Sequence, residues 1–222
     1  MKTACILGAT GLVGAELLSQ LLLNNDFDKV IIFIRRDIAL THSKLVKHTI
    51  NFDDTDSWKQ LVVGDVLFSA FGTTIKKAGS KEVQYKIDYT YQYEFAKAAA
   101  QNGVKKYVLI SSAGANVESS TFYTRIKGKL DSYVSVLNFE QVSIIRPSLL
   151  DGNRKETRLG EQIGIIIANA LSFIPPVRKY RPIKVNIVAT AMISAFRRQN
   201  EKIKIYELEE IRLLAKDLQS NT

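Results

Sequence analysis

Cysteine and histidine are nearly absent from this chain of 222 residues. The single cysteine, Cys5, cannot form an internal disulfide, which excludes a secreted fold held by disulfides and a zinc module built on cysteines. The only two histidines, His42 and His48, leave little from which to build a histidine-rich metal site or a Ser-His-Asp triad. We therefore expect no metal centre.

Long apolar runs are missing as well. The apolar run at residues 4–7 is too short for the core of a secretory signal, and no small-residue cleavage site follows it. The most apolar later stretch, residues 163–175, contains Gly164 and Asn169 and falls far short of the roughly 18 residues that indicate a membrane span. These absences predict a soluble, cytoplasmic protein with no membrane partner.

The residues that are present are typical of one globular domain. Apolar residues make up 46% of the chain and charged residues 24%. Lys and Arg outnumber Asp and Glu by 31 to 22, which gives a net charge of +9. The basic residues occur in short clusters, and no basic helix interleaved with aromatic residues stands out. A solvated surface is therefore favoured over a nucleic-acid interface.

Short β-rich runs alternate with helical runs along the first part of the chain. Strands and helices in regular succession need crossover connections, which predict a parallel sheet. The predicted strands are residues 4–7, 30–34, 49–52, 66–71, 107–110 and 142–145, and the predicted helices are residues 12–23, 54–62, 80–102 and 122–137.

The alternation changes after Pro147. Helices are predicted at residues 159–173, 186–199 and 208–218, and a short strand at 202–206. This segment is too short for an independent domain. We expect a single domain over residues 1–222, with a core at 1–150 and a small C-terminal cap at 151–222 that closes a substrate-side pocket at the carboxyl edge of the sheet.

A glycine-rich turn follows the first predicted strand directly. Gly8 permits a tight turn, Gly11 lets a pyrophosphate approach the backbone, and Gly14 lets the next helix pack on the strand. The N-terminus of that helix offers free N–H groups and a positive dipole end to phosphates. Between a strand and a helix, this spacing predicts a Rossmann-type, doubly wound α/β fold that binds a dinucleotide. The expected contact residues are Gly8, Thr10, Gly11, Leu12, Val13 and Gly14.

Two arginines, Arg35 and Arg36, end the second predicted strand. Arg35 lies 21 residues after Gly14, where NAD-binding folds place an acidic residue on the ribose hydroxyls, at about 20 residues. Guanidinium groups there favour a 2′-phosphate through charge-assisted bonds. The sequence therefore predicts NADPH (NADP) in preference to NADH. The alternative is a solvated pair of arginines at a strand end.

Tyr123 and Lys127 lie four residues apart at the start of a predicted helix, so their side chains share one face. An ammonium group beside a phenol stabilises the phenolate, which makes proton transfer near neutral pH feasible. Ser111 and Ser112 lie upstream, at the carboxyl end of the fifth predicted strand, where ligands bind in open α/β sheets. The alternative is a helix face on the surface.

Together these motifs resemble the short-chain dehydrogenase/reductase superfamily. Within it, the match is to an atypical, NADP-binding group that resembles the Tat-interacting-protein family, and it covers about residues 3–160. The segments that carry the resemblance are residues 8–14, 35–36, 71–74, 77–79, 108–114, 123–128 and 146–150, followed by Arg154 and Arg158.

The resemblance implies a role for each of these residues. Tyr123 would be the general acid, and Lys127 would hold the nicotinamide ribose. Ser111 or Ser112 would orient a substrate carbonyl, and the sequence does not choose between them. Asp88 stands where many members of the superfamily have an asparagine that relays protons. Contacts with the adenosine and phosphate side of the cofactor are further implied for Phe71, Gly72 and Thr73, and contacts with the nicotinamide for Pro147 and Leu149. Substrate contacts are implied for Arg154 and Arg158.

Three functions remain open at this stage. The leading one is an NADPH-dependent oxidoreductase that reduces a small carbonyl compound. The second is a cofactor-bound, redox-sensing regulator or scaffold with little turnover, because many members of the atypical group have no established substrate. The third, a nucleic-acid-associated protein, is not expected from the charge pattern. Tyr85, Tyr89 and Tyr93 recur at helical spacing, which is typical of a core stripe or of a subunit contact in a homodimer.

Overall fold

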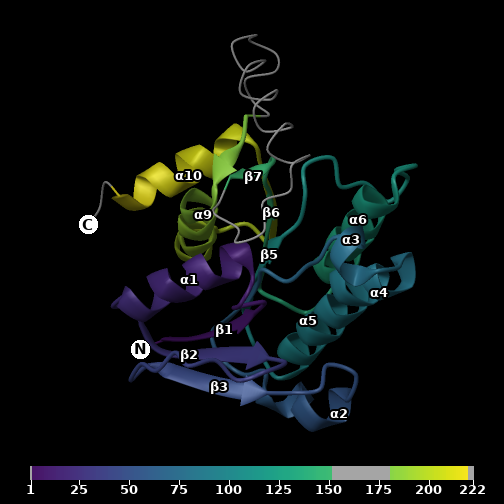
Figure 1. Cartoon of the computed structure of the whole chain (residues 1–222). Helices are drawn as coiled ribbons and strands as arrows, with labels where there is room; N and C mark the ends of the chain where they lie inside the picture. The colour runs from purple at the N-terminus through teal and green to yellow at the C-terminus, as the bar shows by residue number, and fades with distance from the viewer. Residues whose placement is uncertain (1, 152–180, 220–222) are drawn as a thin grey trace.

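The computed structural model describes residues 2–151 and 181–219. Seven parallel strands form a central sheet in the order β3-β2-β1-β4-β5-β6-β9 (Figure 1). The strand order reverses between β1 and β4, which opens a crevice at their carboxyl ends. This architecture confirms the predicted Rossmann-type α/β fold. The strands are β1 Lys2–Leu7, β2 Phe27–Ile34, β3 Leu45–Thr49, β4 Val66–Ser69, β5 Lys106–Ile110, β6 Gln141–Arg146 and β9 Ile203–Glu207.

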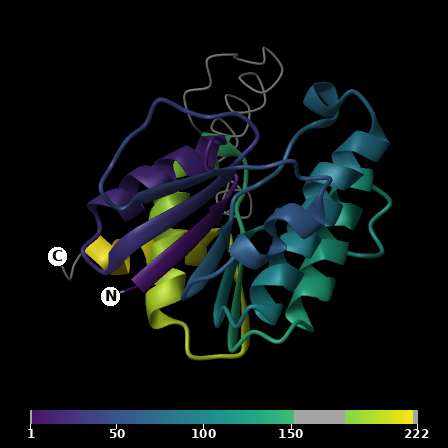
Figure 2. The ribbon, with the colours of Figure 1, turned by 90° about the horizontal axis from the view of Figure 1, so that it is seen from below.

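Helices cover both faces of the sheet (Figures 1 and 2). Neighbouring residues of β1 divide between two cores, since Ala4 and Ile6 pack with α1, α9 and α10, whereas Cys5 and Leu7 pack with α2, α5 and α6. Burial on both faces explains why the strand sequences are continuous apolar runs. The helical segments are α1 Leu12–Leu23, α2 Thr55–Trp58, η1 Lys59–Leu61, α3 Ile75–Ala78, α4 Lys81–Tyr85, η2 Lys86–Thr90, α5 Tyr91–Gln101, α6 Phe122–Ser135, α9 Val185–Arg198 and α10 Glu209–Gln219.

The C-terminal region contributes to the sheet as well as to its carboxyl edge. β9 pairs in parallel with β6, and α9 packs against both α1 and α10. A short pair of strands, β7 (Leu150–Asp151) and β8 (Ile183–Lys184), connects this region to the chain just after β6. Residues 181–219 therefore complete the two-layered core, and the expected cap over a substrate-side pocket stays a prediction. The helix predicted at residues 159–173 lies outside the described residues.

The third strand has a different position from the one predicted. It was expected at residues 49–52 and instead spans Leu45–Thr49, where it pairs with β2. Phe52, at the end of the expected strand, is buried and stacks on Phe71 with 5.3 Å between ring centroids. The residues of the actual strand are only partly buried, so their apolar pattern is weak.

The long helix predicted at residues 80–102 forms as three successive segments, α4, η2 and α5, of which η2 is π-helical. Ser80 begins it as expected, because its hydroxyl accepts a hydrogen bond from the Val83 N–H at 3.2 Å. The wider π-helical turn falls at residues 86–90, and π-helical turns are frequent at functional sites.

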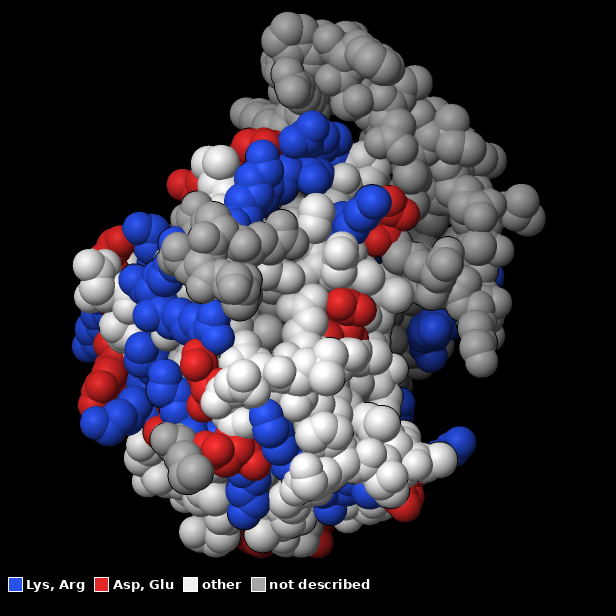
Figure 3. Space-filling view, turned by 90° about the vertical axis from the view of Figure 1, so that its left-hand side faces the viewer, with Lys and Arg blue, Asp and Glu red and all other residues white. Residues whose placement is uncertain are grey.

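On the face drawn in Figure 3, Lys and Arg side chains gather on the left-hand and upper parts, with acidic side chains among them. Arg197 pairs with Asp26 at 2.7 Å, and Arg181 pairs with Glu209 at 3.0 Å. A solvated surface stays a prediction. Within residues 2–151 and 181–219, no helix is both long and apolar enough to cross a membrane.

Candidate cofactor and active site

The glycine turn brings the end of β1, the start of α1 and the end of β4 into close contact. Gly8 has a φ of 90°, and its carbonyl accepts the Gly11 N–H at 2.9 Å. A Cβ on Gly14 would lie 2.0 Å from the Gly8 oxygen, and one on Gly8 would lie 2.6 Å from the Ala70 oxygen. No side chain caps α1 and its first turn has no acidic residue, so its N-terminus suits an anion.

A cleft of about 1670 Å³ opens where the strand order reverses. This volume exceeds the roughly 300–1,000 Å³ of typical small-molecule pockets, so a dinucleotide and a substrate could share it. Most of the predicted site residues line this one cleft: Thr10, Gly11, Leu12, Val13, Phe71, Gly72, Thr73, Ser111, Ser112, Tyr123, Lys127, Pro147 and Leu149. Gly8 and Gly14 shape its floor instead of lining it, and Arg154 and Arg158 lie outside the described residues.

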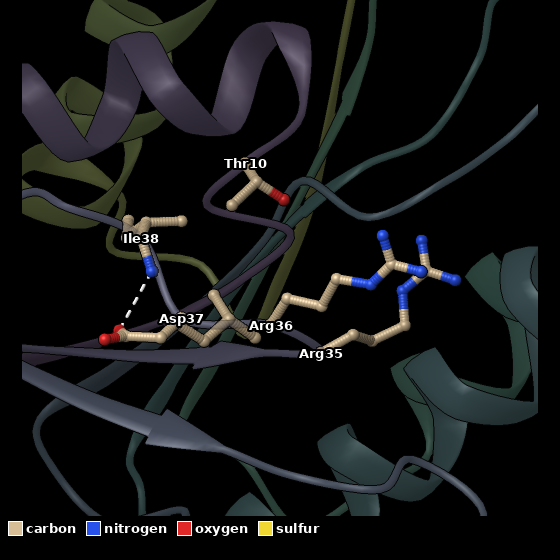
Figure 4. Close-up of a pocket in the computed structure, with 6 residues that line it drawn as sticks. Thr10, Arg35, Arg36, Asp37 and Ile38 are labelled. Atoms are coloured by element: carbon tan, nitrogen blue, oxygen red, sulfur yellow. Dashed lines mark hydrogen bonds between the residues drawn. The ribbon is translucent and has the colours of Figure 1, made fainter.

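Arg35 and Arg36 line a second pocket of about 370 Å³, which adjoins the cleft because Thr10 belongs to both. Their guanidinium groups lie side by side (Figure 4). The acidic residue that follows, Asp37, points away from them, accepts the Ile38 N–H at 2.9 Å and pairs with Lys47 at 2.8 Å. The Lys47 ammonium also lowers the pKa of the Asp37 carboxyl. The pocket therefore offers two cations to an anionic group.

Tyr123 and Lys127 project from α6 into the cleft. Lys127 is 3% exposed and its Nζ donates to the Ile110 carbonyl at 3.4 Å. Gly128 allows this placement, because a Cβ there would lie 2.3 Å from the Asn116 carbonyl carbon. α6 can thus pack directly against the loop that follows β5, and this loop carries both serines.

The two serines have different surroundings. Ser112 is half-buried and its hydroxyl donates to the Ala113 carbonyl at 3.3 Å. Ser111 is buried, and its hydroxyl has no hydrogen-bond partner among the described residues. Of the two, Ser112 therefore presents the more accessible hydroxyl to the cleft.

Asp131 is a buried charged residue behind the cleft that the sequence analysis did not assign. Its Oδ2 accepts from Arg146 Nε at 2.9 Å, and Arg146 Nη1 also pairs with Glu207 at 2.8 Å. Tyr123, Lys127 and Asp131 succeed one another at intervals of four residues, so they form one stripe along α6. That spacing was the available signal, whereas the partner Arg146 comes from β6 and only the fold identifies it.

A family model described as NAD(P)H-binding matches residues 8–160 of the chain. This chain belongs to the NAD(P)H-binding family. The matched segment begins at the glycine turn and includes every strand from β2 to β6, together with all the residues that line the cleft except Val185.

Several curated relatives are similar to this chain over most of its length. "Protein fmp52, mitochondrial" of Emericella nidulans is 39% identical over 77% of this chain and 76% of its own length. "Protein FMP52, mitochondrial" of Candida albicans is 42% identical over 74% of each chain. "Protein FMP52-1, mitochondrial" of Scheffersomyces stipitis is 34% identical over 97% of this chain and 100% of its own. These names give a location and no activity.

Solved structures support the fold of this family member. A UDP-glucose 4-epimerase from Thermotoga maritima has a TM-score of 0.69 at 12% identity, covering 98% of this chain and 82% of its own. The Bordetella bronchiseptica enzyme WbmH in complex with NAD+ has a TM-score of 0.70 at 15% identity, covering 93% of this chain and 76% of its own. At these identities the likeness concerns the fold alone.

The expected cytoplasmic location is wrong, because relatives that are 39% and 42% identical are named as mitochondrial proteins. The expectation was based on the lack of a secretory signal and of a membrane span. Those two features distinguish only some of the destinations of a protein, and neither is needed for residence in this organelle.

Proposed function

We propose that this chain is an NADPH-dependent oxidoreductase that reduces a small carbonyl compound, of the atypical kind that resembles the Tat-interacting-protein family. The observation that carries the proposal is that Tyr123, Lys127 and Ser112 line the same cleft as the phosphate-binding turn at residues 10–13. The N–H groups at the start of α1 also fit the phosphates of the cofactor, since no side chain caps this helix and its first turn has no acidic residue.

NADPH, when bound, supplies the hydride that reduces the carbonyl carbon. Tyr123 donates the proton that neutralises the oxygen, and its phenol must be in hydrogen-bond reach of that oxygen. The Lys127 ammonium holds the ribose next to the nicotinamide and stabilises the phenolate left on Tyr123. Ser112 donates a hydrogen bond to the substrate oxygen and orients it, because its hydroxyl is the less buried of the two serines that line the cleft.

The preference for NADPH follows from the second pocket. Arg35 and Arg36 present two guanidinium groups next to Thr10, and Asp37 is held by Lys47 and Ile38. An arginine pair binds a phosphate with charge-assisted bonds. We therefore place the 2′-phosphate of the cofactor between these arginines and Thr10.

Turnover is the test of this function. Purified protein is mixed with NADPH and a panel of aldehydes and ketones, and loss of absorbance by NADPH is followed. Tyr123→Phe should lower the turnover rate by a factor of about 10² to 10⁴, because general acid catalysis contributes a factor of that size. The variant should keep its affinity for NADPH. Tyr133→Phe is the control, since Tyr133 is on the same helix, is 50% exposed and does not line the cleft.

Other outcomes point to the alternatives. Tight NADPH binding without consumption on any carbonyl would favour a cofactor-bound redox sensor or scaffold. Turnover by Tyr123→Phe at the wild-type rate would show that the tyrosine is not the acid.

We also propose that the chain shares the mitochondrial location of its relatives, which cell fractionation with the native protein would check. A homodimer through the tyrosine stripe remains a prediction.

A further inference from the structure

Asp88 is a buried carboxylate that faces the cleft from the π-helical turn η2. It is 1% exposed, and its Oδ1 lies 3.7 Å from Nζ of Lys127, which is 3% exposed. Removing water from two opposite charges is costly, so a pair this deeply buried persists only when further hydrogen bonds support it. The surroundings of Asp88 provide such bonds.

A second set of contacts joins Asp88 to the opposite wall of the cleft. The Thr73 N–H lies 3.3 Å from each of its carboxylate oxygens. A Cβ on Gly72 would lie 2.8 Å from Asp88 Oδ1, so the glycine lets the backbone approach the carboxylate. A single side chain therefore connects the loop after β4 to the helix that carries Tyr123.

Polar side chains on its own helix hold Asp88 in place. Gln92 donates from Nε2 to the Asp88 carbonyl at 2.8 Å, and the Ser69 hydroxyl donates to Gln92 Oε1 at 2.9 Å. Gln84 is buried as well and hydrogen-bonds to the Asp88 carboxylate. Burial raises the pKa of this carboxyl, and Lys127 and the Thr73 N–H oppose that effect. Gln84, Asp88 and Gln92 form a buried polar stripe facing the sheet.

The donors around Asp88 require a carboxylate. Thr73 N–H, Lys127 Nζ and Gln84 converge on one side chain. An ionised carboxylate only accepts and has about four acceptor sites, whereas an asparagine offers one oxygen and turns two donors toward its neighbours. An asparagine at this position would therefore satisfy fewer of these groups and would leave the Lys127 charge uncompensated.

We propose that Asp88 is a positioning residue that holds the Lys127 ammonium where it contacts the nicotinamide half of NADPH. The proposal rests on the proposed function, because it assumes that NADPH occupies the cleft. The Thr73 N–H fixes the Asp88 carboxylate, and the carboxylate acts on the cofactor through Lys127, whereas the Arg35 and Arg36 pocket is assigned to the adenosine end.

The test compares two ligands that share the adenosine end. Kd is measured for NADPH and for adenosine 2′,5′-bisphosphate, which lacks the nicotinamide half. Asp88→Asn should weaken NADPH roughly ten- to a hundredfold, as expected when a hydrogen bond to a charged group is lost, and should leave the bisphosphate unchanged. Asp53→Asn is the matched control. Asp53, like Asp88, pairs with a lysine, in this case Lys86 of η2, but Asp53 lies outside the cleft and its side chain is half exposed.

A second variant keeps the test decisive if Asp88→Asn fails to fold. Removing both charges, in Asp88→Asn/Lys127→Met, avoids an unpaired buried ion and should bind NADPH no more weakly than Lys127→Met. Equal weakening of both ligands, or wild-type NADPH affinity in Asp88→Asn, would overturn the positioning role. The positioning role would also be overturned if Asp88→Asn/Lys127→Met bound NADPH and adenosine 2′,5′-bisphosphate with the same ratio of affinities as the wild-type protein. Wild-type protein that binds neither ligand would instead refute the proposed function.

Discussion

The arginine pair at the end of β2 is the residue-scale feature that selects the cofactor. We expect wild-type protein to bind NADPH more tightly than NADH. Arg35→Ala/Arg36→Ala should reduce that ratio by at least about ten- to a hundredfold, since the loss of even one charge-assisted hydrogen bond costs about 1.5–3 kcal/mol. Titration of both dinucleotides measures the effect. Arg197→Ala/Arg198→Ala is the control, because these neighbouring arginines on α9 line neither pocket. Equal affinities in wild type would contradict the assignment.

The third glycine of the turn is constrained by backbone contact. Gly14→Ala should destabilise the fold by several kcal/mol, because the added Cβ would lie 2.0 Å from the Gly8 oxygen and the backbone cannot yield without moving α1. Gly79→Ala is the comparison, since a Cβ there meets nothing within 4 Å and only the φ of 82° opposes it, at a cost of about 1 kcal/mol. Urea unfolding of both variants measures the difference, and similar values would contradict this reasoning.

Single residues in short motifs could be predicted from the sequence, and residues with distant partners could not. The spacing of the glycines predicts the turn after β1, and the spacing of Tyr123 and Lys127 predicts that their side chains share one face of a helix. The partners of Asp131 and Gln92 are Arg146 and Ser69, which come from separate strands. Only the arrangement of the sheet brings such pairs together, so the spacing along a helix could point to Asp131 but could not identify its partner.

At the scale of elements, the helix that carries Asp88 depends on its first cap. Ser80→Ala should cost about 1 kcal/mol of unfolding free energy, because the Val83 N–H would lose its acceptor. Ser80→Asp keeps an acceptor at that position and is the control. Chemical denaturation measures both variants. A Ser80→Ala protein as stable as wild type would mean that the first turn frays without consequence for the rest of the helix.

Element boundaries followed the sequence where a cap or an apolar run set them. α1 and α6 begin where predicted, and Ser80 begins the long helix. The strand β3 was misplaced because its own residues, such as Lys47 and His48, are only partly buried and give a weak apolar pattern. The π-helical turn has no sequence pattern of its own. It carries Asp88, whose partners Lys127 and Thr73 come from other elements.

For the molecule as a whole, His48 links stability to pH. Burial in β3, and then Lys29, lower the pKa of His48 below its usual value of 6.5, and its ring stacks on Phe33 at 5.5 Å. The unfolded chain therefore binds this proton more tightly than the folded one, so stability should fall as pH drops through about 6.5. His48→Gln should reduce that slope, and the exposed His42→Gln should not. Urea midpoints between pH 8 and pH 5 measure it, and an unchanged slope in His48→Gln would contradict the assignment.

The C-terminal segment belongs to the core of the domain. We expect the full chain to unfold in one cooperative transition and a chain ending at Asp151 not to fold. α9 buries Val188, Met192 and Phe196 in the core that includes α1, and losing a single large buried side chain typically costs about 2–5 kcal/mol. Together these losses approach or exceed the whole stability of a domain, about 5–15 kcal/mol.

The truncation also exposes the edge of β6, where β9 pairs, and removes Glu207 from Arg146. Near-ultraviolet circular dichroism during urea unfolding distinguishes the outcomes, with the full chain as reference. A sigmoidal transition in the shortened chain would show that residues 1–151 form an independent core and that the remainder is only a cap.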